Sequence, residues 1–332
     1  MNDIAYCGLA CCVCSENETC KGCQSGGCDS HGWCKNYNCC REKGLEGCWA
    51  CSRFPCRGGM LDKPRIRAFA QFAKQHGAEE LSRCLKRNKA NGIRYHYDGQ
   101  LVGDYDLCGS EEEMIEMLRS GTVPAQLHYD LPIRENNDPV YDKPPLQEYM
   151  NKWDGAPFIE LMELSQDKNV LEIGCGTGRL AVRVAPLCGS FTGIDISPET
   201  IKCAERNLSD CKNVSLVRGD FLTHPFRNRF HIIYSSLTFM HIAAKQKAIV
   251  KIADLLERDG RFVLSIDKKK SGYMEMNGRR VKLYPDTPND IENYMEAVHL
   301  TSVKRYETEF AYLLAADKIE SERKYAVTSA LC

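Results

Sequence analysis

The chain has 332 residues, of which 43% are hydrophobic, and a formal net charge of -1 at pH 7. This length predicts two domains, and the apolar fraction is sufficient for buried cores. The near-zero net charge gives no overall preference for nucleic acid or for an anionic membrane surface. No apolar run approaches the ~20 residues of a membrane helix and no signal peptide is recognisable, so we expect a cytoplasmic protein without a membrane partner.

Cysteine is concentrated near the N-terminus, where residues 7–56 contain 13 of the 20 cysteines. Without an export signal, this density indicates metal ligation rather than disulfides. Three Cys-x2-Cys pairs begin at Cys11, Cys20 and Cys48, and such a pair can place two thiolates on one ion. We favour zinc over an iron-sulfur cluster because no Cys-x2-Cys-x2-Cys run is present, and the pairing stays open. The predicted ligands are Cys7, Cys11, Cys14, Cys20, Cys23, Cys28, Cys34, Cys40, Cys48, Cys51 and Cys56.

These cysteines also carry a resemblance. The stretch from Ala-Tyr-Cys-Gly-Leu-Ala-Cys, starting at residue 5, to Cys-Trp-Ala-Cys-Ser-Arg-Phe-Pro-Cys, ending at residue 56, resembles an uncharacterised cysteine-rich family. Cys12 and Cys39 are additional to the family pattern. The resemblance extends over about residues 5–120, and a protein partner could bind through this region.

The remainder of this region predicts mixed structure. Apolar spacing predicts a helix over residues 62–76 that is stopped by Gly77, and a second helix around residues 81–85. Residues 93–105 predict a hairpin that turns at an Asp-Gly pair, and a capping box opens a third helix that ends at residue 121. We therefore predict a small cysteine-rich, metal-binding α+β domain over residues 1–121.

His96 lies in the predicted hairpin. We interpret it as a half-buried strand histidine rather than a metal ligand, because no second ligand lies nearby in sequence.

Residues 122–145 are rich in proline and asparagine and predict an extended connection. Its length favours a functional segment, either a lid over a ligand or a layer on the following sheet. Tyr141 in this segment is a candidate for the substrate side of an active site.

The strongest motif is Leu-Glu-Ile-Gly-Cys-Gly-Thr-Gly, residues 171–178. A buried strand leads into glycines at positions 174, 176 and 178, which let a ligand approach the backbone closely. Glu172 would repel a pyrophosphate but could hydrogen-bond toward a cationic amino-acid ligand. Arg179 stands where a dinucleotide-binding fingerprint has its third glycine.

This motif resembles motif I of the class I S-adenosylmethionine-dependent methyltransferases, and the similarity continues over about residues 145–317. Strands and helices alternate from residue 190 to residue 266, and a final hairpin covers residues 301–316. The expected fold is α/β, a Rossmann-like seven-stranded sheet that is parallel except for the C-terminal hairpin. We place this domain at residues 146–332.

The resemblance and the strand ends indicate the cofactor contacts. Asp195 ends the second strand, where an acid can accept the ribose hydroxyls. Asp220 ends the third strand and resembles the acid that contacts the adenine amino group; a plain turn cap is the alternative. The predicted cofactor-binding residues are Glu172, Gly174, Cys175, Gly176, Gly178, Asp195, Ile196, Asp220, Phe221 and Ser235.

His241 follows the fourth strand and is the candidate base, although alignment of donor and acceptor alone can drive methyl transfer. The segment lacks the Asn/Asp-Pro-Pro-aromatic and Pro-Cys motifs of base methylation. A cluster of Lys and Arg in residues 268–284 suggests a wall for a small, anionic acceptor, whereas nucleic acid is not expected. The rival hypotheses are a non-catalytic, metal-responsive S-adenosylmethionine-binding protein and a nicotinamide oxidoreductase.

Overall fold

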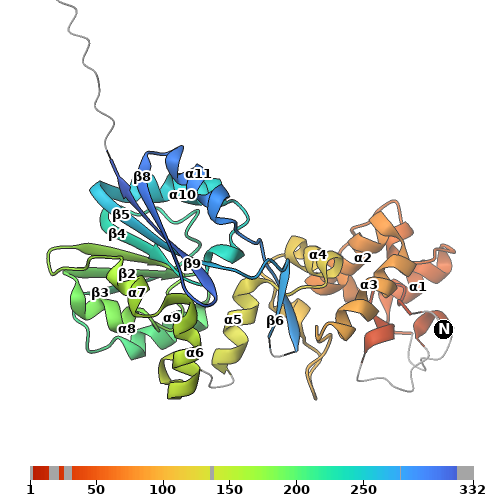
Figure 1. Cartoon of the computed structure of the whole chain (residues 1–332). Helices are drawn as coiled ribbons and strands as arrows, with labels where there is room; N and C mark the ends of the chain where they lie inside the picture. Colours follow the sequence, from red (N-terminus) through yellow and green to blue (C-terminus); the bar gives the residue numbers. More distant parts are fainter. Residues whose placement is uncertain (1–2, 15–21, 26–31, 135–137, 277, 320–332) are drawn as a thin grey trace, which may run out of the picture. The chain divides into compact units, whose positions relative to one another are not determined.

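The computed structural model describes residues 3–14, 22–25, 32–134, 138–276 and 278–319 (Figure 1). The chain forms two compact units. The first contains the chain up to His128 together with Tyr273–Lys282, and the second contains Tyr129–Gly272 and the chain from Leu283 onward. None of the helices in these described ranges is long and apolar enough to cross a membrane.

The second unit is built on a seven-stranded sheet with the order β3-β2-β1-β4-β5-β9-β8. Neighbouring strands from β3 to β5 run parallel, and β9 pairs antiparallel with both β5 and β8. The predicted methyltransferase-type sheet with its C-terminal hairpin is therefore confirmed. The strands are β1 Asn169–Ile173, β2 Ser190–Asp195, β3 Val214–Arg218, β4 Phe230–Ser235, β5 Leu256–Asp267, β8 Leu300–Glu307 and β9 Ala311–Lys318.

The central strands are buried on both faces. Val170 and Leu171 are neighbours in β1 but belong to different core clusters, because successive side chains of a strand point to opposite faces. One cluster contains residues of α10 and α11, and the other contains residues of α7, α8 and α9. The helices of this unit are η6 Pro139–Tyr141, α6 Pro144–Asp154, α7 Ala156–Glu160, α8 Ala181–Val184, η7 Ala185–Leu187, α9 Pro198–Asn207, η8 Phe239–His241, α10 Lys245–Leu255 and α11 Pro288–Glu296.

The first unit is mainly helical, with one short hairpin. Pro64 opens α2 and Gly77 ends it, as predicted, and Ser110 caps α4 by accepting from the Glu113 amide at 3.2 Å. Its elements are η1 Cys11–Val13, η2 Cys23–Ser25, α1 Lys35–Glu42, η3 Cys48–Ala50, η4 Gly59–Asp62, α2 Pro64–His76, α3 Ala78–Ala90, η5 Asp104–Leu107, α4 Glu111–Ser120, β6 Tyr273–Met276 and β7 Arg279–Lys282. Helix α5, Ala125–Arg134, crosses the boundary between the units in sequence.

The prediction of a β-hairpin over residues 93–105 is wrong, because these residues do not form paired strands. The chain does turn at Asp98 and Gly99, but no strand is assigned in this range. Instead, the buried Asp104 carboxylate accepts from the Arg94 amide and from the Tyr97 hydroxyl, each at 2.7 Å. A buried side chain therefore satisfies the Arg94 amide, a backbone donor that a strand ladder could otherwise use.

The prediction of an extended connection over residues 122–145 is also wrong in its first half, because Ala125–Arg134 form helix α5. A proline at position 132 forfeits one backbone hydrogen bond but does not prevent this helix. Leu127 and His128 of α5 are buried, so burial outweighs local propensity.

The basic segment 268–284 is not an open loop. Residues 273–282 form the β6–β7 hairpin of the first unit, and the Val123 amide donates to the Arg280 carbonyl at 2.7 Å. Arg279 is buried and lies 3.2 Å from Asp104, while Lys282 pairs with Glu116 at 2.8 Å. Arg279 and Lys282 therefore do not belong to the predicted basic wall, because both are already paired, while the contribution of Lys269 and Lys270 stays a prediction.

Candidate active site

The turn after β1 is shaped by glycines with positive φ. Gly174 has φ +77°, and its amide donates to the Ile194 carbonyl at 2.8 Å. A Cβ at this position would overlap the Thr238 side chain. Gly174 is therefore required for packing between the turn and the segment that follows β4.

Gly176 has a different environment, although its φ of +54° is similarly unusual for other residues. Its amide donates to Oδ2 of Asp195 at 2.9 Å, so the turn is fixed to the end of β2. A Cβ added to Gly176 would meet no atom within 4 Å. The turn thus presents bare backbone to open space beside a carboxylate, which is the cradle that a bound nucleoside requires.

The Asp195 carboxylate already accepts three hydrogen bonds from within the protein. Its Oδ1 accepts from the Ser197 amide at 2.9 Å and from the Thr200 hydroxyl at 3.2 Å, while Oδ2 accepts from Gly176. Burial raises the pKa of Asp195, and the donors from Ser197 and Gly176 oppose that rise. A carboxylate offers about four acceptor positions, so the vacant one lies on Oδ2. Ile196 next to it is 44% exposed and offers an apolar surface.

Glu172 lies on β1 in a buried setting and accepts from the Tyr234 hydroxyl at 2.9 Å. Burial raises the pKa of Glu172 to about 8, so this carboxyl is largely protonated at neutral pH. Arg179 forms a two-bond ion pair with the fully buried Asp154, which also accepts from the Ser236 hydroxyl. Position 179 therefore ties the end of α6 to the glycine turn.

The raised pKa of Glu172 leads to a prediction about cofactor affinity. If Glu172 faces the cationic part of S-adenosylmethionine, binding favours its ionised form, so affinity should rise as pH increases from 6 to 8. The slope can reach about tenfold per pH unit while the carboxyl is protonated in the free protein. Calorimetry across this range, with the neutral Glu172→Gln variant as control, measures the effect. Parallel pH profiles for the two proteins would exclude Glu172 as the source.

Of three further predicted cofactor contacts, Asp220 is exposed, whereas Phe221 and Ser235 are buried. Asp220 is exposed, and its Oδ1 accepts from the Leu222 amide at 2.9 Å, which is the turn-cap geometry. Phe221 is buried and packs near Phe226, with ring centroids 6.1 Å apart. The buried Ser235 hydroxyl donates to the Ile173 carbonyl at 2.9 Å, so it joins β4 to β1 and is already paired.

Cys175 is also buried, and burial raises the pKa of its thiol. It lies directly against Gly193 of β2, where an added Cβ would come within 3.0 Å of the Cys175 side chain. Any contact of Cys175 with a cofactor would therefore come from its backbone.

His241 lies at the end of η8 and meets a residue that sequence reasoning did not assign to the site. Its Nε2 is 2.9 Å from the Tyr129 hydroxyl, and the two rings meet edge to face at 5.4 Å. Burial raises the pKa of Tyr129 far above its ordinary value, and the charge of Asp195 adds to this rise. Tyr129 is therefore a neutral hydroxyl beside both His241 and the cofactor acid.

The next residue of α5 extends this link. Asp130 accepts from the Ser197 hydroxyl at 2.6 Å, and Ser197 in turn caps α9 through the Thr200 amide. Asp130 and Ser197 are 67 residues apart, and no sequence motif predicted that they would meet. Tyr141, by contrast, is 75% exposed, and its hydroxyl has no hydrogen-bond partner among the described residues. Its catalytic role stays a prediction.

The segment that presents His241 is strained. Leu237 has φ +54°, a conformation that costs a residue with a side chain about 1–2 kcal/mol. The Thr238 hydroxyl lies within hydrogen-bond distance of the Ser236 and Gly174 carbonyls, at 3.1 and 3.4 Å. This bend directs the chain from β4 across the glycine turn.

Two of the N-terminal cysteines, Cys40 and Cys48, form a close pair. Cys40 and Cys48 have sulfurs 3.7 Å apart, close to the ~3.8 Å that separates two thiolates on one tetrahedral zinc with 2.3 Å bonds. Burial raises the pKa of Cys7 to about 12, and the sulfurs of Cys23 and Cys34 add to that rise. Among the described residues, no group of three or more candidate ligands has the geometry of a metal site. The predicted ligands Cys20 and Cys28 lie outside those residues.

Comparison with known proteins identifies the second unit. Residues 164–312 match a family model described as a methyltransferase domain. The chain therefore carries a methyltransferase domain with the Rossmann-like fold of class I.

Two curated relatives have similar sequences. Malonyl-[acyl-carrier protein] O-methyltransferase 1 of Ilyobacter polytropus is 26% identical over 120 residues, which are 36% of this chain and 44% of that protein. The uncharacterised methyltransferase YcgJ of Bacillus subtilis is 29% identical over 110 residues, 32% of this chain and 44% of that protein. The chain thus spans less than half the length of these relatives.

Among solved structures, the N-methyltransferase NodS of Bradyrhizobium japonicum, in complex with S-adenosyl-L-homocysteine, is 19% identical. The match covers 58% of this chain and 99% of NodS, with a TM-score of 0.44.

Proposed function

We propose that this protein transfers a methyl group from S-adenosylmethionine to a small-molecule acceptor. The observation that carries the proposal is the bare backbone of Gly176, which faces open space and is hydrogen-bonded to Asp195. This arrangement would hold the ribose at the vacant position of Asp195 and the adenine near Ile196. A cationic ligand would favour ionisation of the buried Glu172 carboxyl and a pyrophosphate would oppose it, which favours S-adenosylmethionine over a nicotinamide cofactor.

The bound cofactor would supply a methyl group on a positively charged sulfur. The protein's contribution is to align donor and acceptor and to exclude water, which can provide most of the acceleration for an in-line displacement. His241 would face the acceptor, with Tyr129 fixing its ring through the 2.9 Å contact at Nε2. Because Tyr129 stays neutral, it holds the ring without adding a charge.

We propose a small molecule as acceptor because the formal net charge of -1 gives no overall attraction to a nucleic-acid backbone. Arg279 and Lys282 are paired and do not face an acceptor as free cations, so the charge of the acceptor is left open. The name of the Ilyobacter relative shows that a related sequence methylates an acyl-carrier substrate at oxygen.

We also propose that the cysteine-rich segment binds zinc, with an iron-sulfur cluster as the alternative. The 3.7 Å separation of Cys40 and Cys48 supports a shared ion, and the scarcity of aliphatic residues before Cys56 supports a need for metal cross-links. Such a module could bind a protein partner, with the chain acting in the cytoplasm.

Methyl-labelled S-adenosylmethionine tests the enzymatic proposal. The full chain is incubated separately with small-molecule, RNA and protein fractions, and both label transfer and S-adenosylhomocysteine formation are measured. We expect label only in the small-molecule fraction. Label in RNA or protein would overturn the acceptor class. Binding of S-adenosylhomocysteine without turnover in any fraction would favour the non-catalytic alternative.

A further inference from the structure

A cavity of about 310 Å³ lies in the first unit, where helices α2 and α4 begin. A volume of this size is typical of small-molecule sites. The lining includes Pro64, Arg65, Asp106, Cys108, Gly109 and Met114. The cofactor cradle belongs to the second unit, so this cavity is a separate candidate site.

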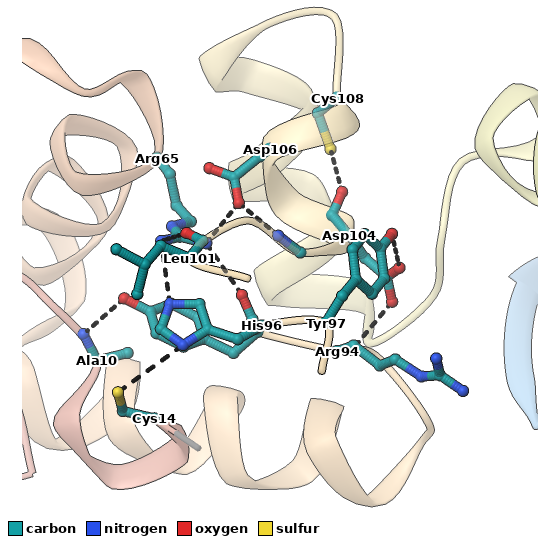
Figure 2. A network of polar contacts seen from close by, with 12 residues as sticks. Ala10, Cys14, Arg65, Arg94, His96, Tyr97, Leu101, Asp104, Asp106 and Cys108 are labelled. Atoms are coloured by element: carbon teal, nitrogen blue, oxygen red, sulfur yellow. Dashed lines mark hydrogen bonds and ion pairs between the residues drawn. The ribbon is translucent and has the colours of Figure 1, made fainter. Parts of the chain in front are cut away.

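Arg65 has one donor that its neighbours leave unpaired. Its Nη1 donates to the Tyr95 carbonyl at 3.0 Å and to the Asp106 carboxylate (Figure 2). Its Nη2 donates to the Leu101 carbonyl at 3.1 Å and lies 3.4 Å from Nε2 of His96. A guanidinium has five N–H donors, and these contacts use the two at each Nη. The remaining donor, at Nε, is buried and has no hydrogen-bond partner among the described residues.

The burial of Arg65 makes this donor informative. Only 4% of the residue is exposed. Buried donors normally have a partner, because an unpaired one forfeits the hydrogen bond that it made with water. Since Arg65 lines the cavity, a ligand there can accept from Nε.

The charges around the cavity favour an anion. Arg65 and Arg67 lie in the first turn of α2, which contains no acidic residue. Asp106 pairs with Arg65, and Glu111 pairs with Arg67 at 2.6 Å, so these two arginines and two acids balance. The N-terminal end of α2 adds a partial positive charge to this neutral set, and anions are stabilised at such an end.

Much of the remaining lining is uncharged. Burial raises the pKa of the Cys108 thiol to about 12, so this side chain is neutral at neutral pH. Pro64 and the buried Met114 contribute apolar surface. Apolar surface gains free energy when it is removed from water, so this wall suits the hydrocarbon part of a ligand.

We propose that this cavity binds a small organic carboxylate, which accepts a hydrogen bond from Nε of Arg65 and packs its chain against Pro64 and Met114. Inorganic phosphate fits less well, because its several oxygens would meet a single side-chain N–H donor and an apolar wall. The proposal depends neither on metal binding by the cysteines nor on the cofactor cradle.

NMR titration of the full chain with straight-chain carboxylates from acetate to hexanoate tests the proposal. The matching primary amide serves as the uncharged counterpart of each acid. We expect at least one carboxylate to shift both the ¹H–¹⁵N resonance of Arg65 Nε and the methyl resonance of Met114 at millimolar concentration. The matching amide should bind about tenfold or more weakly, because it cannot accept a hydrogen bond with a full negative charge. Inorganic phosphate should also bind more weakly than the best carboxylate.

A variant that fills the cavity tests its location. Replacing Arg65 itself would also break its contacts with Asp106 and Tyr95, so Gly109→Leu is the better change. The atoms nearest to an added Cβ at Gly109 belong to Glu113 and lie at 3.4 Å or more, so a side chain fits there without overlap. Gly109→Leu should lower carboxylate affinity about tenfold or more, a loss of about 1.4 kcal/mol or more in binding free energy. Gly32→Leu is the matched control, because an added Cβ there meets no described atom within 4 Å, and it should leave affinity unchanged.

Each of four results would overturn the proposal. These are no shift at Arg65 with any of the carboxylates, equal binding of acid and amide, tighter binding of phosphate, and unchanged affinity in Gly109→Leu. Thermal unfolding verifies that both variants fold. The comparison of acid and amide uses the unmodified chain, so it decides the matter even where a variant unfolds.

Discussion

Replacing Arg279 with methionine is expected to destabilise the first unit by about 3–5 kcal/mol, the usual consequence of removing one partner from a buried ion pair. Asp104 is completely buried and its Oδ2 lies 3.2 Å from Nε of Arg279. Without the guanidinium, the donors that the described residues would still offer this buried carboxylate are the Arg94 amide and the Tyr97 hydroxyl. Amide hydrogen exchange of α2 and α4 measures the loss, with the strands of the second unit as internal reference.

Two controls accompany this variant. Arg280→Met breaks an exposed ion pair with Glu275 in the same hairpin and should cost less than about 1 kcal/mol. The double variant Asp104→Asn with Arg279→Met should recover part of the stability, because it also removes the stranded charge. Equal, small effects of the two arginine variants would contradict the structural role given to Arg279.

Gly176→Ala is expected to lower affinity for S-adenosylhomocysteine about tenfold or more, which corresponds to about 1.4 kcal/mol. The new Cβ would enter the open space beside Asp195 that we assign to the cofactor. It would also place alanine at φ +54°, a strain of about 1–2 kcal/mol. Calorimetric titration gives the affinity, and thermal unfolding gives the stability.

Gly44→Ala is the matched control for backbone strain. Gly44 has φ +61°, and a Cβ there would also meet no atom within 4 Å. The two variants should lose similar stability, but only Gly176→Ala should lose affinity. An equal loss of affinity in both would mean that strain, rather than occupation of the cradle, explains the effect.

The sheet and the cofactor turn could be predicted because their signals are local. An apolar strand, alternate glycines and an acid at the end of the next strand lie within residues 169–195. The start of α9 is also marked locally, because Pro198 is its first residue and the Ser197 hydroxyl before it accepts from the Thr200 amide.

The rest depends on contacts between distant residues. Tyr129 and His241 are 112 residues apart, and Tyr129 lies in a stretch whose prolines predicted extended chain. Asp104 and Arg279 are 175 residues apart, and neither a single acid nor a basic run indicates its partner. Cys14 and His96 are 82 residues apart and approach each other only in the folded chain.

We propose that the Gly176–Asp195 cradle binds S-adenosylmethionine. Calorimetric titration of the unmodified full chain with S-adenosylhomocysteine, and separately with NADH, tests it most directly. We expect one-site binding of S-adenosylhomocysteine and no binding of NADH. Binding of NADH, or no binding of S-adenosylhomocysteine by the folded protein, would contradict it.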